Sequence, residues 1–154
     1  MKIKCAIIGG GEFALNSTIP SLLRTKRFDI KYLVVRSGDR ISGLGNSMDP
    51  ITLTSSIDEV LHDPEINSVF ITTRHHLHKE QIIAALNADK NVFSEKPLAM
   101  NLSDARQILD VARNSKCKIM LGFNRRFSPF ALEIRHHLQN IAGRSVPEYL
   151  RTAS

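Results

Sequence analysis

The stretch IKCAIIGGGEFA, residues 3–14, decides the fold of this chain. Its first six residues form an apolar run typical of a buried strand, and the glycines end that run. Its last six match the pattern G-x-G-x-x-A directly after a strand and at the start of a helix, which is the context this motif requires. Gly9 permits the tight turn, Gly11 lets the backbone approach a pyrophosphate, and Ala14 lets helix and strand pack closely. The stretch predicts a dinucleotide site at a Rossmann turn, with an ordinary tight βα turn as the alternative.

The remaining sequence alternates short apolar runs with helical periodicity, as the βαβ units of a parallel sheet do. The runs are apolar throughout, so we expect an α/β, doubly wound parallel sheet of about six strands with helices on both faces. Strands are expected at residues 3–8, 30–35, 51–54, 68–72, 91–94 and 118–122. Helices are expected at residues 14–25, 56–62, 78–88 and 129–140, and a further helix is expected from Ser103, with apolar positions at helical spacing as far as Ala112.

Local signals refine these helices. Pro20 should kink or weaken the first one. A capping box begins at Ser56, Ser103 is expected to cap a later helix, and Ser128 with Pro129 marks the start of the last. Residues 36–50 are polar and Gly-rich and indicate a loop. We expect residues 1–140 to form the dinucleotide-binding domain, and residues 141–154 to be a tail leading toward a further domain.

The composition excludes several classes of protein. No stretch approaches about 18 uninterrupted apolar residues, so no membrane helix is expected, and the first residues lack a signal-peptide pattern. We therefore expect a cytoplasmic protein. Cys5 and Cys117 make neither a disulfide scaffold nor a metal motif, and we expect both to be inert core residues. The net charge of +6 raises nucleic-acid binding as an alternative, but the basic residues are scattered, so we expect none.

The end of the second strand bears on the choice between NAD and NADP. No acidic residue stands there to bind a ribose 2′-hydroxyl. Arg36 follows instead, and Ser37 and Arg40 could join it around a 2′-phosphate. This pattern favours NADP over NAD, while an Arg36 that is only a solvated loop residue is the alternative.

Two further motifs follow the fourth and fifth strands, on the ligand side of the sheet. They are TTRHHLH, residues 72–78, and SEKP, residues 94–97. A lysine in the second motif can hydrogen-bond a substrate oxygen and shift its proton affinity. The three histidines invite a metal interpretation, but no carboxylate or thiol stands near them in the sequence. We expect helix capping and cofactor contact there, and no metal.

Taken together, GGGEFA, TRHHLH, EKPLA and GFNRRFSP closely resemble the Gfo/Idh/MocA family (glucose–fructose oxidoreductase / inositol dehydrogenase), from residue 2 to about residue 140. The resemblance implies a two-domain oxidoreductase whose N-terminal half binds NAD(P). The reaction implied is hydride transfer between the nicotinamide and a carbinol carbon of a sugar, cyclitol or similar polyol.

The resemblance also assigns residues. It implies that Lys96 is the catalytic, substrate-facing lysine, and that Pro97 sets the backbone beside the nicotinamide. His75 departs from the family, which often has Asn there, so that ribose contact is the least supported. With the residues identified above, the predicted cofactor-binding set is Gly9, Gly11, Glu12, Phe13, Ala14, Arg36, Ser37, Thr72, Thr73, Arg74, His75, His78, Glu95, Lys96, Pro97, Asn124 and Arg125.

In this family a second domain begins near residue 125–150 and supplies an acid–base histidine and most substrate contacts. The sequence ends at Ser154, so we expect the chain to be the cofactor half and to be inactive by itself. A polyol is expected to reach it through that second domain, and we expect a homo-oligomer and an exposed apolar surface where the domain would pack. The alternative is a non-catalytic NAD(P)-binding sensor or regulatory module.

Overall fold

The computed structural model describes residues 2–36 and 51–140. The predictions for Ser37 and Arg40, and for the loop around them, lie outside the described residues. The chain divides into two compact units, Met1–Gly122 and Phe123–Ser154, and each is described by itself. The predicted domain boundary near residue 140 stays a prediction.

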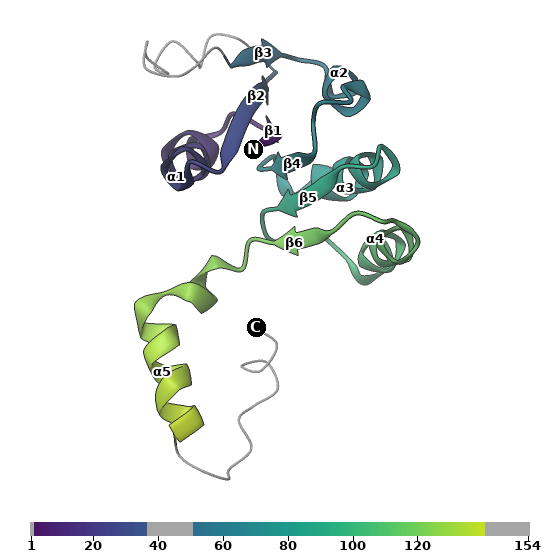
Figure 1. Ribbon diagram of the computed structural model, residues 1–154. Helices are drawn as coiled ribbons and strands as arrows, with labels where there is room; N and C mark the ends of the chain where they lie inside the picture. Colours follow the sequence, from purple (N-terminus) through teal and green to yellow (C-terminus); the bar gives the residue numbers. More distant parts are fainter. Residues whose placement is uncertain (1, 37–50, 141–154) are drawn as a thin grey trace. The chain divides into compact units, whose positions relative to one another are not determined.

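The first unit is built on a parallel sheet of six strands in the order β3-β2-β1-β4-β5-β6 (Figure 1). This order and the all-parallel pairing confirm the predicted Rossmann-like α/β fold. Three of the six strands end one residue earlier than predicted, so that Val35, Thr72 and Gly122 already belong to loops. The strands are β1 Ile3–Ile8, β2 Phe28–Val34, β3 Thr52–Thr54, β4 Ser68–Ile71, β5 Asn91–Ser94 and β6 Ile119–Leu121.

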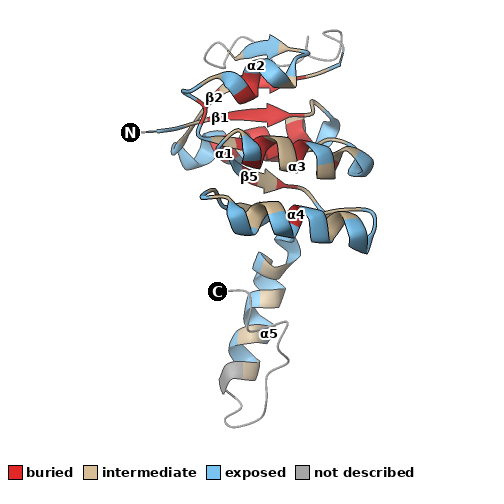
Figure 2. Cartoon of the chain, turned by 90° about the vertical axis from the view of Figure 1, so that its right-hand side faces the viewer, coloured by how far each residue is buried: buried red, intermediate tan, exposed pale blue. Residues whose placement is uncertain are grey.

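Helices cover both faces of the sheet (Figure 1). One face packs against α1, Ile19–Thr25, and the other against α2, Ile57–His62, α3, His78–Asn87, and α4, Leu102–Asn114. The buried residues lie on the inner strands of the sheet and on the sheet-facing sides of the helices (Figure 2). The helix α4 is exposed along most of its length and fully buries only Ile108.

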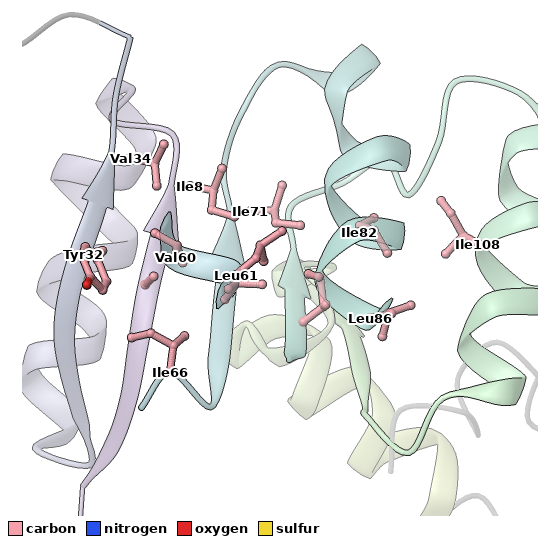
Figure 3. Close-up of a cluster of buried hydrophobic side chains, with 14 residues drawn as sticks. Ile8, Tyr32, Val34, Val60, Leu61, Ile66, Ile71, Ile82, Leu86 and Ile108 are labelled. Atoms are coloured by element: carbon pink, nitrogen blue, oxygen red, sulfur yellow. The ribbon is translucent and has the colours of Figure 1, made fainter. Parts of the chain in front are cut away.

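Alternate residues of β1 serve two separate cores. Ala6 and Ile8 join the cluster under α2, α3 and α4, where Leu61, Ile82 and their neighbours meet (Figure 3). Cys5 and Ile7 join the cluster under α1. Burial raises the pKa of the Cys5 thiol to about 12, and the nearby charge of Asp29 adds to the rise. The strand is therefore apolar on both faces, as a doubly covered parallel strand must be.

The first helix confirms that Pro20 disturbs it. A π-helical turn, Ala14–Thr18, precedes α1, and the Ile19 N–H donates to the Ala14 carbonyl, five residues back. A proline in a regular helix lacks the N–H donor and clashes with the carbonyl four residues earlier. The wider π turn takes up this conflict without ending the helix. The disturbance is therefore a local widening of the helix next to the glycine turn.

The helix caps agree with the sequence in two of three cases. Ser56 caps α2 by accepting from the Glu59 N–H at 3.2 Å, and Ser128 accepts from the Ala131 N–H at 3.3 Å as α5, Pro129–Asn140, begins. The prediction of Ser103 as a cap is wrong. Asn101 caps α4: its backbone is extended and its Oδ1 accepts from the Asp104 N–H at 2.9 Å. Ser103 is already inside the helix, so its hydroxyl has no terminal N–H to bind.

The second unit contains a 3-10 helix, Asn124–Phe127, and α5. The side chains of Phe130 and Ile134 on α5 are exposed by 78% and 57%. The expectation that a further domain packs on an apolar surface of this chain stays a prediction. None of the described helices is both long enough and apolar enough to cross a bilayer.

Candidate functional site

Three sequence motifs meet at one edge of the first unit. The strands β1, β4 and β5 are neighbours and parallel, so the segments that follow them all leave the sheet at its carboxyl end. The chain runs from β1 to β2 on one side and places β4 on the other, which makes the β1/β4 boundary the topological switch point. Ligands of open α/β sheets bind at such a point.

Gly9 makes the tight turn after β1. Its φ of +109° is outside the range that other L-residues adopt comfortably. An added Cβ would lie 3.0 Å from the Thr72 carbonyl carbon and the Thr73 nitrogen. The turn is therefore pressed against the end of β4, and only glycine fits there.

Gly11, in contrast to Gly9, has open space where a side chain would stand. An added Cβ would meet no described atom within 4 Å, so nothing in the described chain requires a glycine there. The next residue, Glu12, is already helical, and the N–H groups of a first helical turn have no partner within their helix. An open space beside free N–H donors is what a pyrophosphate needs, so the turn fits a dinucleotide. Ala14 is fully buried, as its predicted packing role requires.

A cleft of about 820 Å³ opens beside the turn. Its size is within the usual range of roughly 300–1,000 Å³ for ligand pockets. It is bounded by the ends of β1 and β2, the start of α2, the loop after β4 and one side of α3. The predicted residues Gly9, Arg36, Thr73 and Arg74 line it. Arg36 and Arg74 are exposed and form no ion pair with any described residue.

Hydrogen bonds join the three motifs into one network. The Thr72 hydroxyl donates to the Gly9 carbonyl at 2.8 Å, which ties the end of β4 to the glycine turn. The Thr73 hydroxyl donates to Gln81 Oε1 at 2.5 Å. His78 contacts the Thr73 carbonyl through Nε2 at 3.1 Å and the Pro97 carbonyl through Nδ1 at 2.7 Å. The loop after β4 is therefore held to the segment after β5.

His78 requires a correction. It was predicted to line the dinucleotide, but its ring is fully buried and both of its nitrogens face backbone carbonyls. Its side chain is thus committed to the protein interior. His75, at the start of the 3-10 helix His75–Leu77, is exposed. Its ring meets the His78 ring edge-on, with the two ring centroids 5.8 Å apart. It remains free to meet a ligand.

The segment after β5 carries the predicted catalytic lysine. The Glu95 N–H donates to the Ile71 carbonyl at 2.9 Å, which extends the pairing of β5 with β4 by one residue. Lys96 is exposed and makes no ion pair with any described residue, and its peptide bond to Pro97 is cis. The lysine amine therefore faces solvent at the edge where the other motifs meet.

Two residues of the site were missed. A Cβ at Gly122 would lie 2.8 Å from Glu95 Oε1, so Gly122 makes room for the Glu95 carboxylate. Gln81 is buried and accepts from Thr73. The helical spacing gives a signal for Gln81 and His78 alike, because both fall on the buried stripe of Ile82 and Ala85. Polar residues on a buried stripe point to a specific internal partner.

The cofactor contacts predicted for Glu12, Phe13, Asn124 and Arg125 stay predictions. Glu12 and Phe13 are exposed at the glycine turn, with Phe13 46% exposed. Asn124 and Arg125 belong to the second unit, so their part in the site stays a prediction. Among the described residues, no group of three His, Cys, Asp or Glu side chains is placed to hold a metal ion.

Comparison with known proteins agrees with this geometry. The family model described as an oxidoreductase family with an NAD-binding Rossmann fold matches residues 3–123. A 1,5-anhydro-D-fructose reductase of Ensifer adhaerens is 38% identical over 101 residues, which are 66% of this chain and 25% of the relative. A myo-inositol 2-dehydrogenase of Thermotoga maritima is 32% identical over 82 residues, 53% of this chain and 25% of the relative.

Solved structures give the same result. An oxidoreductase from Bacillus cereus superposes with a TM-score of 0.83 at 27% identity, covering 90% of this chain and 40% of that one. The chain thus spans well under half the length of the proteins that it matches. Its motifs, its sheet order and the family model agree, and the chain belongs to the Gfo/Idh/MocA oxidoreductase family, of which it contains the NAD-binding Rossmann domain.

Proposed function

We propose that this chain binds NAD(P) at the glycine turn, as the cofactor part of an oxidoreductase that moves a hydride between the nicotinamide and a sugar, cyclitol or similar polyol. The observation that carries the proposal is the space at Gly11, which no described atom of the chain fills. The relatives support the substrate class, because two of them are named for acting on an anhydro sugar and on an inositol.

Different residues around the turn bind different parts of the dinucleotide. Gly11 and the first helical turn face the pyrophosphate with N–H donors, while the Gly9 N–H donates to the Val34 carbonyl at 3.0 Å and so shapes the turn. The cleft lined by Arg36, Thr73 and Arg74 takes the rest of the adenine nucleotide. Arg36 is exposed just after β2 and forms no ion pair with a described residue, which supports NADP over NAD.

Lys96 is the residue that meets the substrate. The bound dinucleotide supplies the site that accepts or donates the hydride. The exposed Lys96 ammonium donates a hydrogen bond to the substrate oxygen and stabilises negative charge that develops on it during the transfer. Lys96 has no described partner to give up, so this interaction requires no internal ion pair to break.

Other parts of the whole protein's activity are part of the same proposal. The polyol would be held mainly by a second domain of the kind the family has, and the acid–base histidine would come from there. We propose assembly as a homo-oligomer, a cytoplasmic location, and no role for nucleic acid or membrane.

The test is dinucleotide binding by Gly11→Val, measured by calorimetry with NADPH and NADH. The new side chain enters open space, so the thermal midpoint should stay within about 3 °C of the wild type. Affinity should fall at least tenfold, because the valine occupies the space assigned to the pyrophosphate. Absence of binding by the wild type, or full binding by the variant, would refute the proposal. Arg36→Gln is the companion variant: it should weaken NADPH about tenfold and leave NADH unchanged.

A further inference from the structure

We propose that His78 is a positioning residue that fixes the segment carrying Lys96, by donating its Nδ1–H to the Pro97 carbonyl. The importance of Lys96 rests on the proposed function, while the hydrogen bond itself does not. His78 was predicted to contact the cofactor, and its proposed role is instead to position the backbone beside Lys96.

The backbone around Lys96 shows why one hydrogen bond matters there. On the N-terminal side the Glu95 N–H donates to the Ile71 carbonyl at 2.9 Å. On the C-terminal side Pro97 has no N–H, so its carbonyl is its only backbone hydrogen-bonding group. That carbonyl lies 2.7 Å from His78 Nδ1. Lys96 is therefore held between one anchor from the sheet and one from His78.

Lys96 contributes nothing to its own placement. Its side chain is exposed and forms no hydrogen bond or ion pair with a described residue. Its Cα position consequently depends on the two flanking anchors. The His78 ring, by contrast, is 0% exposed on the first turn of α3, a helix that packs on β4, β5 and α4. A rigid element thus sets the position of an otherwise untethered lysine.

The chemistry of the ring fixes the direction of the bond. Both partners of His78 are carbonyl oxygens, and a carbonyl can only accept. The shorter contact, to Pro97, requires a proton on Nδ1. The contact of Nε2 with the Thr73 carbonyl, at 3.1 Å, is the longer of the two, so we assign the proton of the neutral ring to Nδ1.

Two variants separate positioning from simple packing. Asn places its amide nitrogen one bond beyond Cγ, where His has Nδ1, so His78→Asn keeps a donor toward Pro97. Gln places its amide nitrogen one bond farther out, close to the place of Nε2, so His78→Gln keeps a donor toward Thr73 only. Both variants lose the ring, and a residue that merely fills space would respond to them equally. His76→Gln, at an exposed neighbouring histidine, is the control.

The experiment uses the full 154-residue chain without cofactor and measures ¹⁵N relaxation of the Lys96 amide. The order parameter should be near 0.85 in the wild type, His78→Asn and His76→Gln, and should fall below about 0.6 in His78→Gln. Equal values in the two His78 variants would overturn the proposal.

A second measurement needs no substitution and covers the case in which the variants do not fold. The ¹⁵N–¹H spectrum of the wild-type His78 ring should show a proton on Nδ1, and a ring protonated at Nε2 alone would overturn the proposal. Both readouts are taken without dinucleotide. A wild type that binds no NAD(P) would therefore refute the proposed function and leave this inference standing.

Discussion

Two groups of charged residues at opposite ends of the same parallel sheet differ in their pairing. At the amino end, Lys4, Lys31, Asp63 and Glu65 form a network of ion pairs. At the carboxyl end, Arg36, Arg74 and Lys96 face solvent and form no ion pair with a described residue. Both groups belong to the first unit and are carried by the same sheet.

The amino-end network centres on the loop between α2 and β4. Lys31 contacts Asp63 and Glu65, both at 2.6 Å, and Lys4 contacts Glu65 at 2.5 Å. The buried Lys90 donates to the Asp63 carbonyl at 2.8 Å. The Lys31 ammonium holds the pKa of the Asp63 carboxyl down to about 2. The charges of this network are therefore satisfied within the protein and contribute to stability.

Arg36, Arg74 and Lys96 have no such partner among the described residues, whereas Lys79, also at this end, pairs with Asp104 at 2.7 Å. On the proposed function, the partners of the three open cations come from the bound dinucleotide and its substrate. Cations left open beside free N–H donors attract an anion, and pairing them internally would remove that attraction. Paired charges and tightly packed backbone positions are thus expected to contribute to stability, and open positions to contribute little. Four substitutions, each with a matched control, test this contrast, from the largest expected effect to the smallest.

Gly9→Ala is expected to cost the most, at about 3 kcal/mol of unfolding free energy. The Cβ meets backbone atoms of Thr72 and Thr73 at 3.0 Å, and the φ of +109° is strained for alanine. Gly11→Ala is the matched control and should change stability by less than about 1 kcal/mol. Urea unfolding measures both. Equal losses at the two glycines would mean that Gly11 is also a packing residue.

Asp63→Asn is expected to cost about 1.5 kcal/mol at pH 7, because it breaks a charged hydrogen bond at a carboxylate only 10% exposed. The pKa of Asp63 is lowered from 3.8 to about 2 by folding, so its contribution is present above pH 4 and is lost as the pH falls toward 2. Unfolding curves of wild type and variant should therefore converge between pH 4 and pH 2. Glu65→Gln, at a 50% exposed carboxylate, should cost less. Curves that stay parallel down to pH 2 would show that the carboxylate is not stabilised by Lys31.

Asn101→Ala is expected to cost about 1 kcal/mol, the usual value of a helix cap. Ser103→Ala, two residues along, should change stability by less than about 0.5 kcal/mol, because Ser103 lies inside α4. Thermal unfolding of the pair decides the matter. A larger loss at Ser103 would restore the prediction that the structure overturned.

Lys96→Met is expected to change stability least, by less than about 0.5 kcal/mol. Its amine has no described partner to lose, whereas Lys31→Met at the other end removes two contacts at 2.6 Å and should cost more. Urea unfolding at pH 7 compares them. A Lys96 variant as destabilised as the Lys31 variant would end the contrast between the two ends.

Local sequence was enough for much of this structure. Apolar runs and the glycine turn predict the strands and their parallel pairing, because a buried parallel strand needs apolar residues on both faces. Pro20 predicts a disturbed helix because its missing N–H acts locally. The cap at Ser56 is likewise set by residues next to it.

The errors lie where position depends on distant parts of the chain. Asn101 and Ser103 are both good caps, and the choice between them depends on where the segment after Pro97 delivers the chain to α4. His78 has the chemistry of a ligand contact, but packing of α3 on the sheet buries it. The role of Gly122 depends on a carboxylate 27 residues earlier in the sequence, at Glu95, just after the neighbouring strand β5.

The rate at which a reagent labels the buried Cys5 thiol measures how often the sheet opens at its central strand. A thiol reagent attacks the thiolate, and in the folded chain this one is inaccessible in the central strand with a pKa near 12. Its modification must wait until β1 leaves the sheet. Cys117 is only half-buried, just before the edge strand β6. The ratio of the two labelling rates in the unaltered chain therefore reports how much more often the edge of the sheet opens than its centre.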